Sequence, residues 1–74
     1  MTLGEYRVGI TFNPSADERV NAIKVQAAAL IDYLEAQRHK GPPEAERLIS
    51  LAQTNIEDAA MWGVKAVTKG DFNA

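Results

Sequence analysis

A proline break near the middle of the chain constrains the fold more than any other feature. Gly41-Pro42-Pro43 follows the basic residues Arg38 to Lys40, and two successive prolines cannot continue a helix because neither has an amide hydrogen to donate. The segments on both sides carry apolar residues at helical spacing. Because the connection is short, the two helices must lie antiparallel. The sequence therefore predicts an all-α helical hairpin.

The first helix is expected over residues 15–38. Ser15 and Glu18 have the spacing of a capping box, in which two side chains satisfy free amides at a helix start. Gly41 is expected to close this helix, with His39 in solvent. Between these ends the apolar residues recur in steps of three and four, as in a coiled-coil seam: Val20, Ile23, Ala27, Leu30 and Leu34.

The second helix is expected over about 43–68, followed by a tail at 69–74, and it carries two apolar stripes. One stripe consists of Leu48, Ala52, Ala59, Trp62 and Ala66, and the other of Ile49, Ile56, Ala60, Gly63 and Val67. One partner helix covers one stripe, so the second stripe predicts a homo-oligomer. A mid-helix glycine costs about 1 kcal/mol relative to alanine, so Gly63 suggests a close backbone approach. We expect Trp62 to pack at a helix interface.

Residues 1–14 are expected to form an extended N-terminal arm. Val8, Ile10 and Phe12 alternate with less apolar residues, which indicates an extended segment rather than a helix. Such a segment either lies on the helices as an arm or pairs with another subunit as an edge strand, and the arm is the favoured interpretation. Residues 1–74 are then one domain, short enough that association would add to its stability.

Composition argues against several classes of function. The net charge of −2 and the pI of about 5.2 are unlike those of proteins that bind duplex nucleic acid. The chain has no cysteine and one histidine, so neither a thiolate nor a His-rich metal site is available within it. No apolar run approaches the ~20 residues of a membrane span, and Met1 to Tyr6 lack the plan of a signal peptide. We expect a cytoplasmic protein.

The polar residues do not form a recognisable catalytic set. Ser50 and Thr54 have no histidine partner at a suggestive spacing, and Glu57-Asp58 is not part of a metal-binding Glu-Glu-x-x-Glu cluster. These two acids are expected to lie in solvent or to pair with Lys and Arg. We therefore expect neither an enzyme nor a cofactor.

Anion binding remains as a chemical possibility. Arg7 adjoins Tyr6, Phe12-Asn13 leads into the first helix, and Lys24 flanks its seam. An aromatic ring, a cation and free helix-start amides are the groups that a nucleotide needs. The alternative is structural: Tyr6 and Phe12 hold the arm against the helices, and Lys24 extends along apolar surface.

Three stretches of the sequence resemble a known family. They are Phe12-Asn13-Pro14-Ser15, Val20-Asn21-Ala22-Ile23-Lys24 and the stretch from Glu57 to Thr68. Together, over about residues 12–68, they resemble small phage-encoded hairpin proteins that act as cyclic-nucleotide sponges against CBASS, with a related branch against Thoeris. The resemblance implies a homo-oligomer, commonly a hexamer, that sequesters immune second messengers without cleaving them in the cytoplasm of the infected bacterial host.

The resemblance also implies ligands and site residues. Cyclic dinucleotides such as 3′,3′-cGAMP would lie between subunits, held by Lys24 and by an aromatic residue that is either Phe12 or Tyr6. Cyclic trinucleotides would use a basic residue late in the second helix, and the other branch binds cyclic ADP-ribose derivatives. The candidate ligand-binding residues are therefore Tyr6, Arg7, Phe12, Asn13, Lys24, Lys65 and Thr68. The alternative function is a structural or protein-interaction module that docks on another protein.

Overall fold

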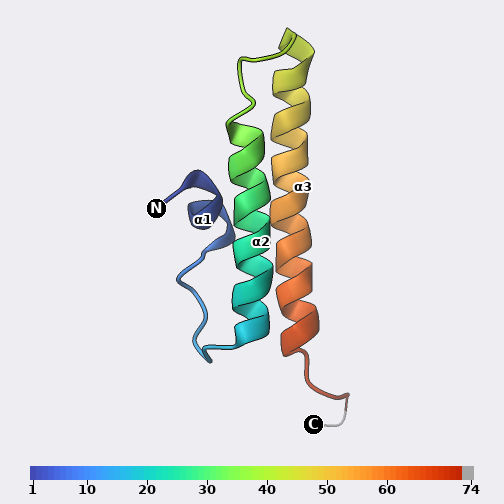
Figure 1. Ribbon diagram of the computed structural model, residues 1–74. Coiled ribbons are helices and arrows are strands. Elements are labelled where there is room, and N and C mark those ends of the chain that lie inside the picture. Colours follow the sequence, from blue (N-terminus) through green and yellow to red (C-terminus); the bar gives the residue numbers. More distant parts are fainter. Residues whose placement is uncertain (73–74) are drawn as a thin grey trace.

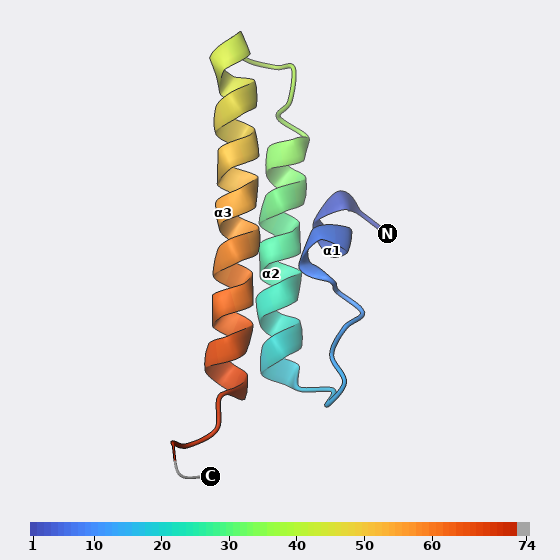
Figure 2. The ribbon, with the colours of Figure 1, turned by 180° about the vertical axis from the view of Figure 1, so that it is seen from behind.

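The fold is a helical hairpin with a short helix packed beside it. The computed structural model describes residues 1–72, which form three helices and no strand: α1 (Leu3–Val8), α2 (Glu18–Glu35) and α3 (Pro43–Thr68). The two long helices lie side by side and antiparallel, and α1 packs against α2 (Figures 1 and 2). The prediction of an all-α hairpin is confirmed, and α3 begins and ends where the sequence indicates.

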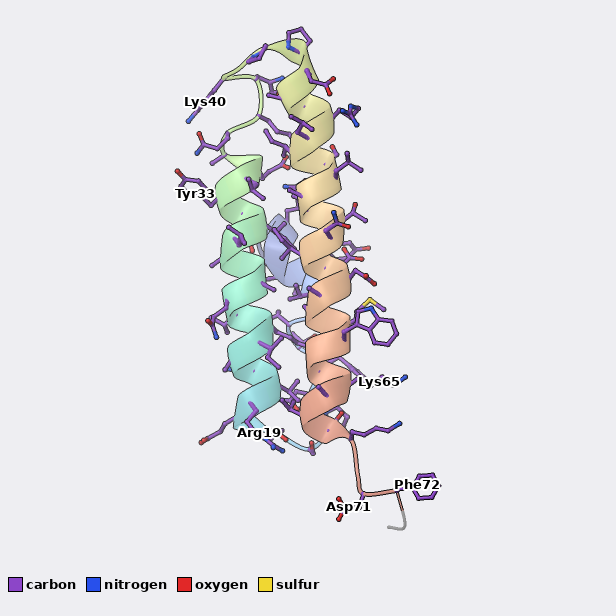
Figure 3. All side chains as sticks on the ribbon, turned by 90° about the vertical axis from the view of Figure 1, so that its right-hand side faces the viewer. Arg19, Tyr33, Lys40, Lys65, Asp71 and Phe72 are labelled. Atoms are coloured by element: carbon purple, nitrogen blue, oxygen red, sulfur yellow. The ribbon has the colours of Figure 1, made fainter. Side chains whose placement is uncertain are left out.

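The molecule is a thin plate of helices. Its principal-axis extents are 51 × 25 × 12 Å. The short α1 covers part of one face of the α2–α3 pair (Figure 3) and the rest of the pair is open to solvent, so few side chains are buried. The buried apolar residues are Val20, Ala28 and Ile31 on α2 and Ile49 and Ala60 on α3.

The two apolar stripes of α3 have different environments. Ile49 and Ala60 are buried against α2, whereas Leu48 and Trp62 of the other stripe are exposed, Trp62 at 61 %. Trp62 therefore does not pack between the helices of the hairpin. A Cβ atom on Gly63 would lie 3.5 Å from the Ile23 side chain, an ordinary contact. The hairpin itself does not require a glycine at this position.

The expectation of an extended arm at residues 1–14 is wrong, because the segment contains α1. Thr2 and Glu5 form a capping box: the Thr2 hydroxyl accepts a hydrogen bond from the Glu5 amide, and the Glu5 carboxylate accepts one from the Thr2 amide. Gly9, with a φ of 65°, ends the helix in the left-handed conformation. Local capping at both ends therefore overrides the alternating pattern of the later residues.

The start of α2 differs from the prediction. Asp17, not Ser15, is the N-cap residue, and its carboxylate accepts a hydrogen bond of 2.8 Å from the Arg19 amide. The Asn13 side chain closes a turn ahead of it, accepting from the Asp17 amide and donating to the Asp17 carbonyl. Ser15 lies within that turn, so it is not available to cap the helix.

The end of α2 also differs. The helix ends at Glu35 rather than near Arg38, and the left-handed residue of the connection is His39, with a φ of 66°, rather than Gly41. Arg38 folds back, and its Nε donates to the Glu35 carboxylate at 2.8 Å. His39 has an exposed side chain, as expected. Across residues 1–72 the structure contains no helix that is long and apolar enough to span a membrane.

Candidate functional site

A pocket lies where all three helices meet. Its volume is about 220 Å³, and its walls come from two residues of α1, one of α2 and four of α3: Arg7, Val8, Lys24, Glu57, Ala60, Met61 and Val64. Small-molecule sites in proteins usually measure about 300–1,000 Å³. One chain therefore offers space for part of a nucleotide-sized ligand, and the pocket brings together two of the candidate residues, Arg7 and Lys24.

Lys24 is the most buried cation of the site, at 7 % exposure. Its ammonium group donates to the carbonyl oxygens of Gly9, at 2.8 Å, and of Phe12, and it lies 5.5 Å from the centre of the Phe12 ring. An ammonium group has three N–H donors, and residues 1–72 supply acceptors for two of them. Lys24 thus holds the loop after α1 and keeps one donor for another acceptor.

Arg7 reaches the pocket from α1 and is held there by α3. Its Nε donates to the Glu57 carboxylate at 2.8 Å. Its two terminal nitrogens make longer contacts, 3.5 Å to the Gln53 side-chain oxygen and 3.4 Å to the Thr54 hydroxyl. These contacts are near the limit of hydrogen bonding, so the terminal nitrogens are only weakly engaged.

The two aromatic candidates differ in their relation to Lys24. Tyr6 and Phe12 are 74 % and 73 % exposed, so neither holds the N-terminal segment against the helices. Only the Phe12 ring has the Lys24 ammonium beside it. Asn13 follows Phe12, but both ends of its amide are used in the turn before α2. Phe12 is therefore the exposed ring at the pocket cation, and Asn13 shapes the loop that carries it.

Lys65 and Thr68 both lie near the end of α3 and outside this pocket. Lys65 points away from the hairpin (Figure 3), and its ammonium lies 5.4 Å from the centre of the Trp62 ring. With Asp58, Met61 and Trp62 it lines a second hollow of about 210 Å³. The Thr68 hydroxyl donates to the Val64 carbonyl at 2.7 Å. Met61 lines both hollows, so they are adjacent but distinct.

A buried polar network supports the pocket from one side. Gln53 is 1 % exposed; it donates to the Ile31 carbonyl and the Glu35 carboxylate, and it accepts from Arg38 at 2.8 Å. The hydrogen bond from Gln53, and then that from Arg38, hold the pKa of Glu35 below its ordinary value. The weaker contact from Arg7 joins the same amide. The network thus links α1, α2 and α3 behind the site.

Sequence reasoning missed three residues of this site. Gln53, Glu57 and Met61 recur at four-residue steps along α3, so they share one face of the helix. Gln53 also lies between Ile49 and Ile56 of the second apolar stripe, and a glutamine at that position was the signal that could have identified the buried network. Glu57 was expected to lie in solvent or pair with a cation, and it pairs with Arg7. The partner lies 50 residues away, at a separation that no local pattern reveals.

Comparison with protein families identifies the domain. Residues 5–68, most of the chain, match the family described as the Acb2/Tad1 hairpin domain. The chain belongs to the Acb2/Tad1 hairpin family. This is the anti-CBASS and anti-Thoeris sponge family that the sequence motifs resemble, a family of binding domains rather than enzymes. Neither the curated proteins nor the solved structures gave a significant match.

The side chains at the pocket of this Acb2/Tad1 hairpin agree with membership of a family of binding domains. The pocket is lined by two cations, one carboxylate and apolar side chains, and the exposed Phe12 ring lies beside its Lys24 ammonium. Among residues 1–72 no group of three His, Cys, Asp or Glu side chains is placed to hold a metal ion. The arrangement is suited to holding an anionic, base-containing ligand.

Proposed function

We propose that this protein binds cyclic oligonucleotide second messengers and sequesters them intact, which suppresses CBASS-type antiphage defence in the infected bacterium. Membership of the sponge family supports the class of ligand. The observation that carries the proposal is the convergence of Arg7 and Lys24 on one pocket, with the Phe12 ring beside the Lys24 ammonium. A nucleotide is bound by cations that contact its phosphate and by an aromatic ring, close to those cations, that stacks on its base.

Lys24 supplies the first contact in this proposal. Two of its three donors hold the loop carbonyls, and the third is directed to a ligand phosphate. Because the ammonium is already desolvated, its interaction with a phosphate is stronger than that of a solvated lysine. Phe12 stacks on the base attached to that phosphate, in preference to Tyr6, for which the structure shows no neighbouring cation contact.

Association of copies completes the site. A pocket of about 220 Å³ is smaller than a typical ligand site, and the exposed stripe of α3 that contains Leu48 and Trp62 is available to pack against another chain. We therefore propose a homo-oligomer, a hexamer by resemblance, in which ligands lie between subunits. Lys65 and Thr68, outside the first pocket, belong in this proposal to a second site for cyclic trinucleotides.

Calorimetry with a panel of ligands tests the proposal. The panel contains cyclic di- and trinucleotides, including 3′,3′-cGAMP, and isomers of cyclic ADP-ribose. We expect saturable binding of at least one member and recovery of the unaltered ligand after heat release. Failure to bind every member overturns the proposal, and recovery of a cleaved product shows an enzyme instead.

The second candidate function is a protein-interaction module. The exposed apolar side chains of α3 favour it, since Leu48, Leu51 and Trp62 are all about half exposed or more. Light scattering separates the two functions. A closed homo-oligomer without any partner supports the sponge, whereas a monomer that gains order only with another protein supports the interaction module.

A further inference from the structure

Glu57 places a negative charge inside the cationic pocket. It lines the pocket together with Arg7 and Lys24, and its carboxylate lies 2.8 Å from Arg7 Nε. The Arg7 and Glu57 side chains are 22 % and 35 % exposed, so the pair is only partly solvated. Charge-assisted hydrogen bonds of this kind are about twice as strong as neutral ones. The strongest contact that Arg7 makes is therefore internal.

The internal pair opposes the binding of a phosphate. A phosphate oxygen that approaches Arg7 meets a guanidinium whose Nε is already committed to a carboxylate. If the phosphate takes that position, Glu57 remains nearby with an unpaired negative charge, and like charges at short range repel. The formal charge of the pocket side chains is the sum of two cations and one anion, which leaves a single positive charge for a ligand that carries two phosphates.

We propose that Glu57 sets the affinity of the site, because its carboxylate competes with ligand phosphate for Arg7. This inference rests on the proposed function, and it assigns to Glu57 a role opposite to that of Lys24. Replacing the carboxylate by an amide removes the competitor. The oxygen of the introduced amide still accepts a hydrogen bond from Arg7, so the tie between α1 and α3 is kept in neutral form.

The substitution Glu57→Gln tests the competition, with 3′,3′-cGAMP as the probe in calorimetric titrations. We expect the dissociation constant to fall on the order of tenfold, and we expect the gain to shrink as salt is added, because salt screens partly exposed charges. Thermal melting and circular dichroism confirm that the variant is folded. Glu57→Met, which is neutral and has no oxygen acceptor, repeats the test and must show a gain in the same direction.

Glu44→Gln is the matched control. Glu44 pairs with Arg47 on the exposed first turns of α3, outside the pocket, and its substitution changes the net charge by the same amount, from −2 to −1. We expect unchanged binding in Glu44→Gln. An equal gain in this control attributes the effect to overall charge and overturns the inference.

The Arg7→Ala background separates competition for Arg7 from direct repulsion. If Glu57 acts mainly by occupying Arg7, Glu57→Gln gains much less affinity when Arg7 is absent than when it is present, because only the direct repulsion between Glu57 and phosphate remains to be removed. An equal or larger gain in the Arg7→Ala background overturns the inference. Unchanged or weaker binding by folded Glu57→Gln, with wild type still binding, overturns it as well and leaves the proposed function standing. Absence of binding by wild type and all variants overturns both.

Discussion

Gly4 is the position where a single methyl group has the clearest expected effect on the fold. A Cβ atom there would lie 2.1 Å from the Ala28 carbonyl oxygen and 2.9 Å from the Ala28 Cα. Both are backbone atoms of α2, so they cannot rotate away as a side chain does. Gly4→Ala therefore requires α1 to move away from α2.

Three contributions determine the size of the effect. Moving α1 breaks the 2.7 Å hydrogen bond from the Gly4 amide to the Asp32 carboxylate, and a hydrogen bond to a charged group contributes about 1.5–3 kcal/mol. Crowding a packed interface costs about 1–3 kcal/mol. The higher helix propensity of alanine returns at most ~1 kcal/mol. We expect a net loss of about 3 kcal/mol in the free energy of unfolding, which lowers Tm by roughly 15 °C in a domain of this size.

Urea unfolding followed by circular dichroism measures the change, at one fixed protein concentration because association shifts apparent stability. Gly63→Ala is the matched control: its Cβ makes only an ordinary contact with Ile23, so we expect it to stabilise the chain by up to about 1 kcal/mol. Amide hydrogen exchange of Arg7 and Val8 should accelerate in Gly4→Ala, because a six-residue helix is not stable once undocked. Equal stability of Gly4→Ala and wild type would refute the packing argument.

Three further substitutions test the site and the helix start. Lys24→Ala should abolish dinucleotide binding in calorimetry, and retained binding contradicts the assignment of Lys24 to the ligand site. The same variant should lose about 1–3 kcal/mol in the free energy of unfolding measured in urea, because the Gly9 and Phe12 carbonyls lose their donor. Lys65→Ala should abolish trinucleotide binding and leave dinucleotide binding unchanged, and a loss of both, or dissociation of the oligomer, shows a structural role. The side-chain hydrogen bond from Arg19 lowers the pKa of Asp17 below its ordinary value of 3.8. The ionised Asp17 carboxylate therefore contributes its full stabilisation above pH 3.8 and loses it as pH falls through the lowered pKa. Asp17→Asn keeps a capping side chain but does not titrate, so the decline of Tm at acid pH should be less steep in this variant.

Local patterns in the sequence were sufficient for the two long helices. Repeated apolar positions at steps of three and four require a helix to bury them, and Pro42-Pro43 separates the two helices and starts α3. The ends of α2 were not fixed by these patterns, because the helix begins at Glu18 and ends at Glu35. The same local chemistry was available for α1 in the Thr2–Glu5 capping box. The prediction failed there because Val8, Ile10 and Phe12 also fit an extended pattern. Two local signals competed, and the packing of Gly4 on Ala28 favours the helix.

The candidate site was predictable in its residue types but not in its contacts. Arg7 and Lys24 were identified as cations near aromatic residues, and the pocket brings them together. The sequence does not reveal that the Lys24 ammonium binds the carbonyls of Gly9 and Phe12, because backbone carbonyls are the same in every residue. Nor does it separate Phe12 from Tyr6, whose side chains differ in their neighbours rather than in their exposure.

The sequence by itself determined the hairpin, its antiparallel direction and its family, since these depend on periodicity, on a short connection and on motifs that are local in the chain. Only the tertiary structure decided which charges meet. Arg7 and Glu57 are 50 residues apart, and they form an ion pair because α1 docks where its glycine allows close approach to α2. Coulombic energy depends on distance in space and on exposure to solvent, and both quantities exist only after the helices have packed.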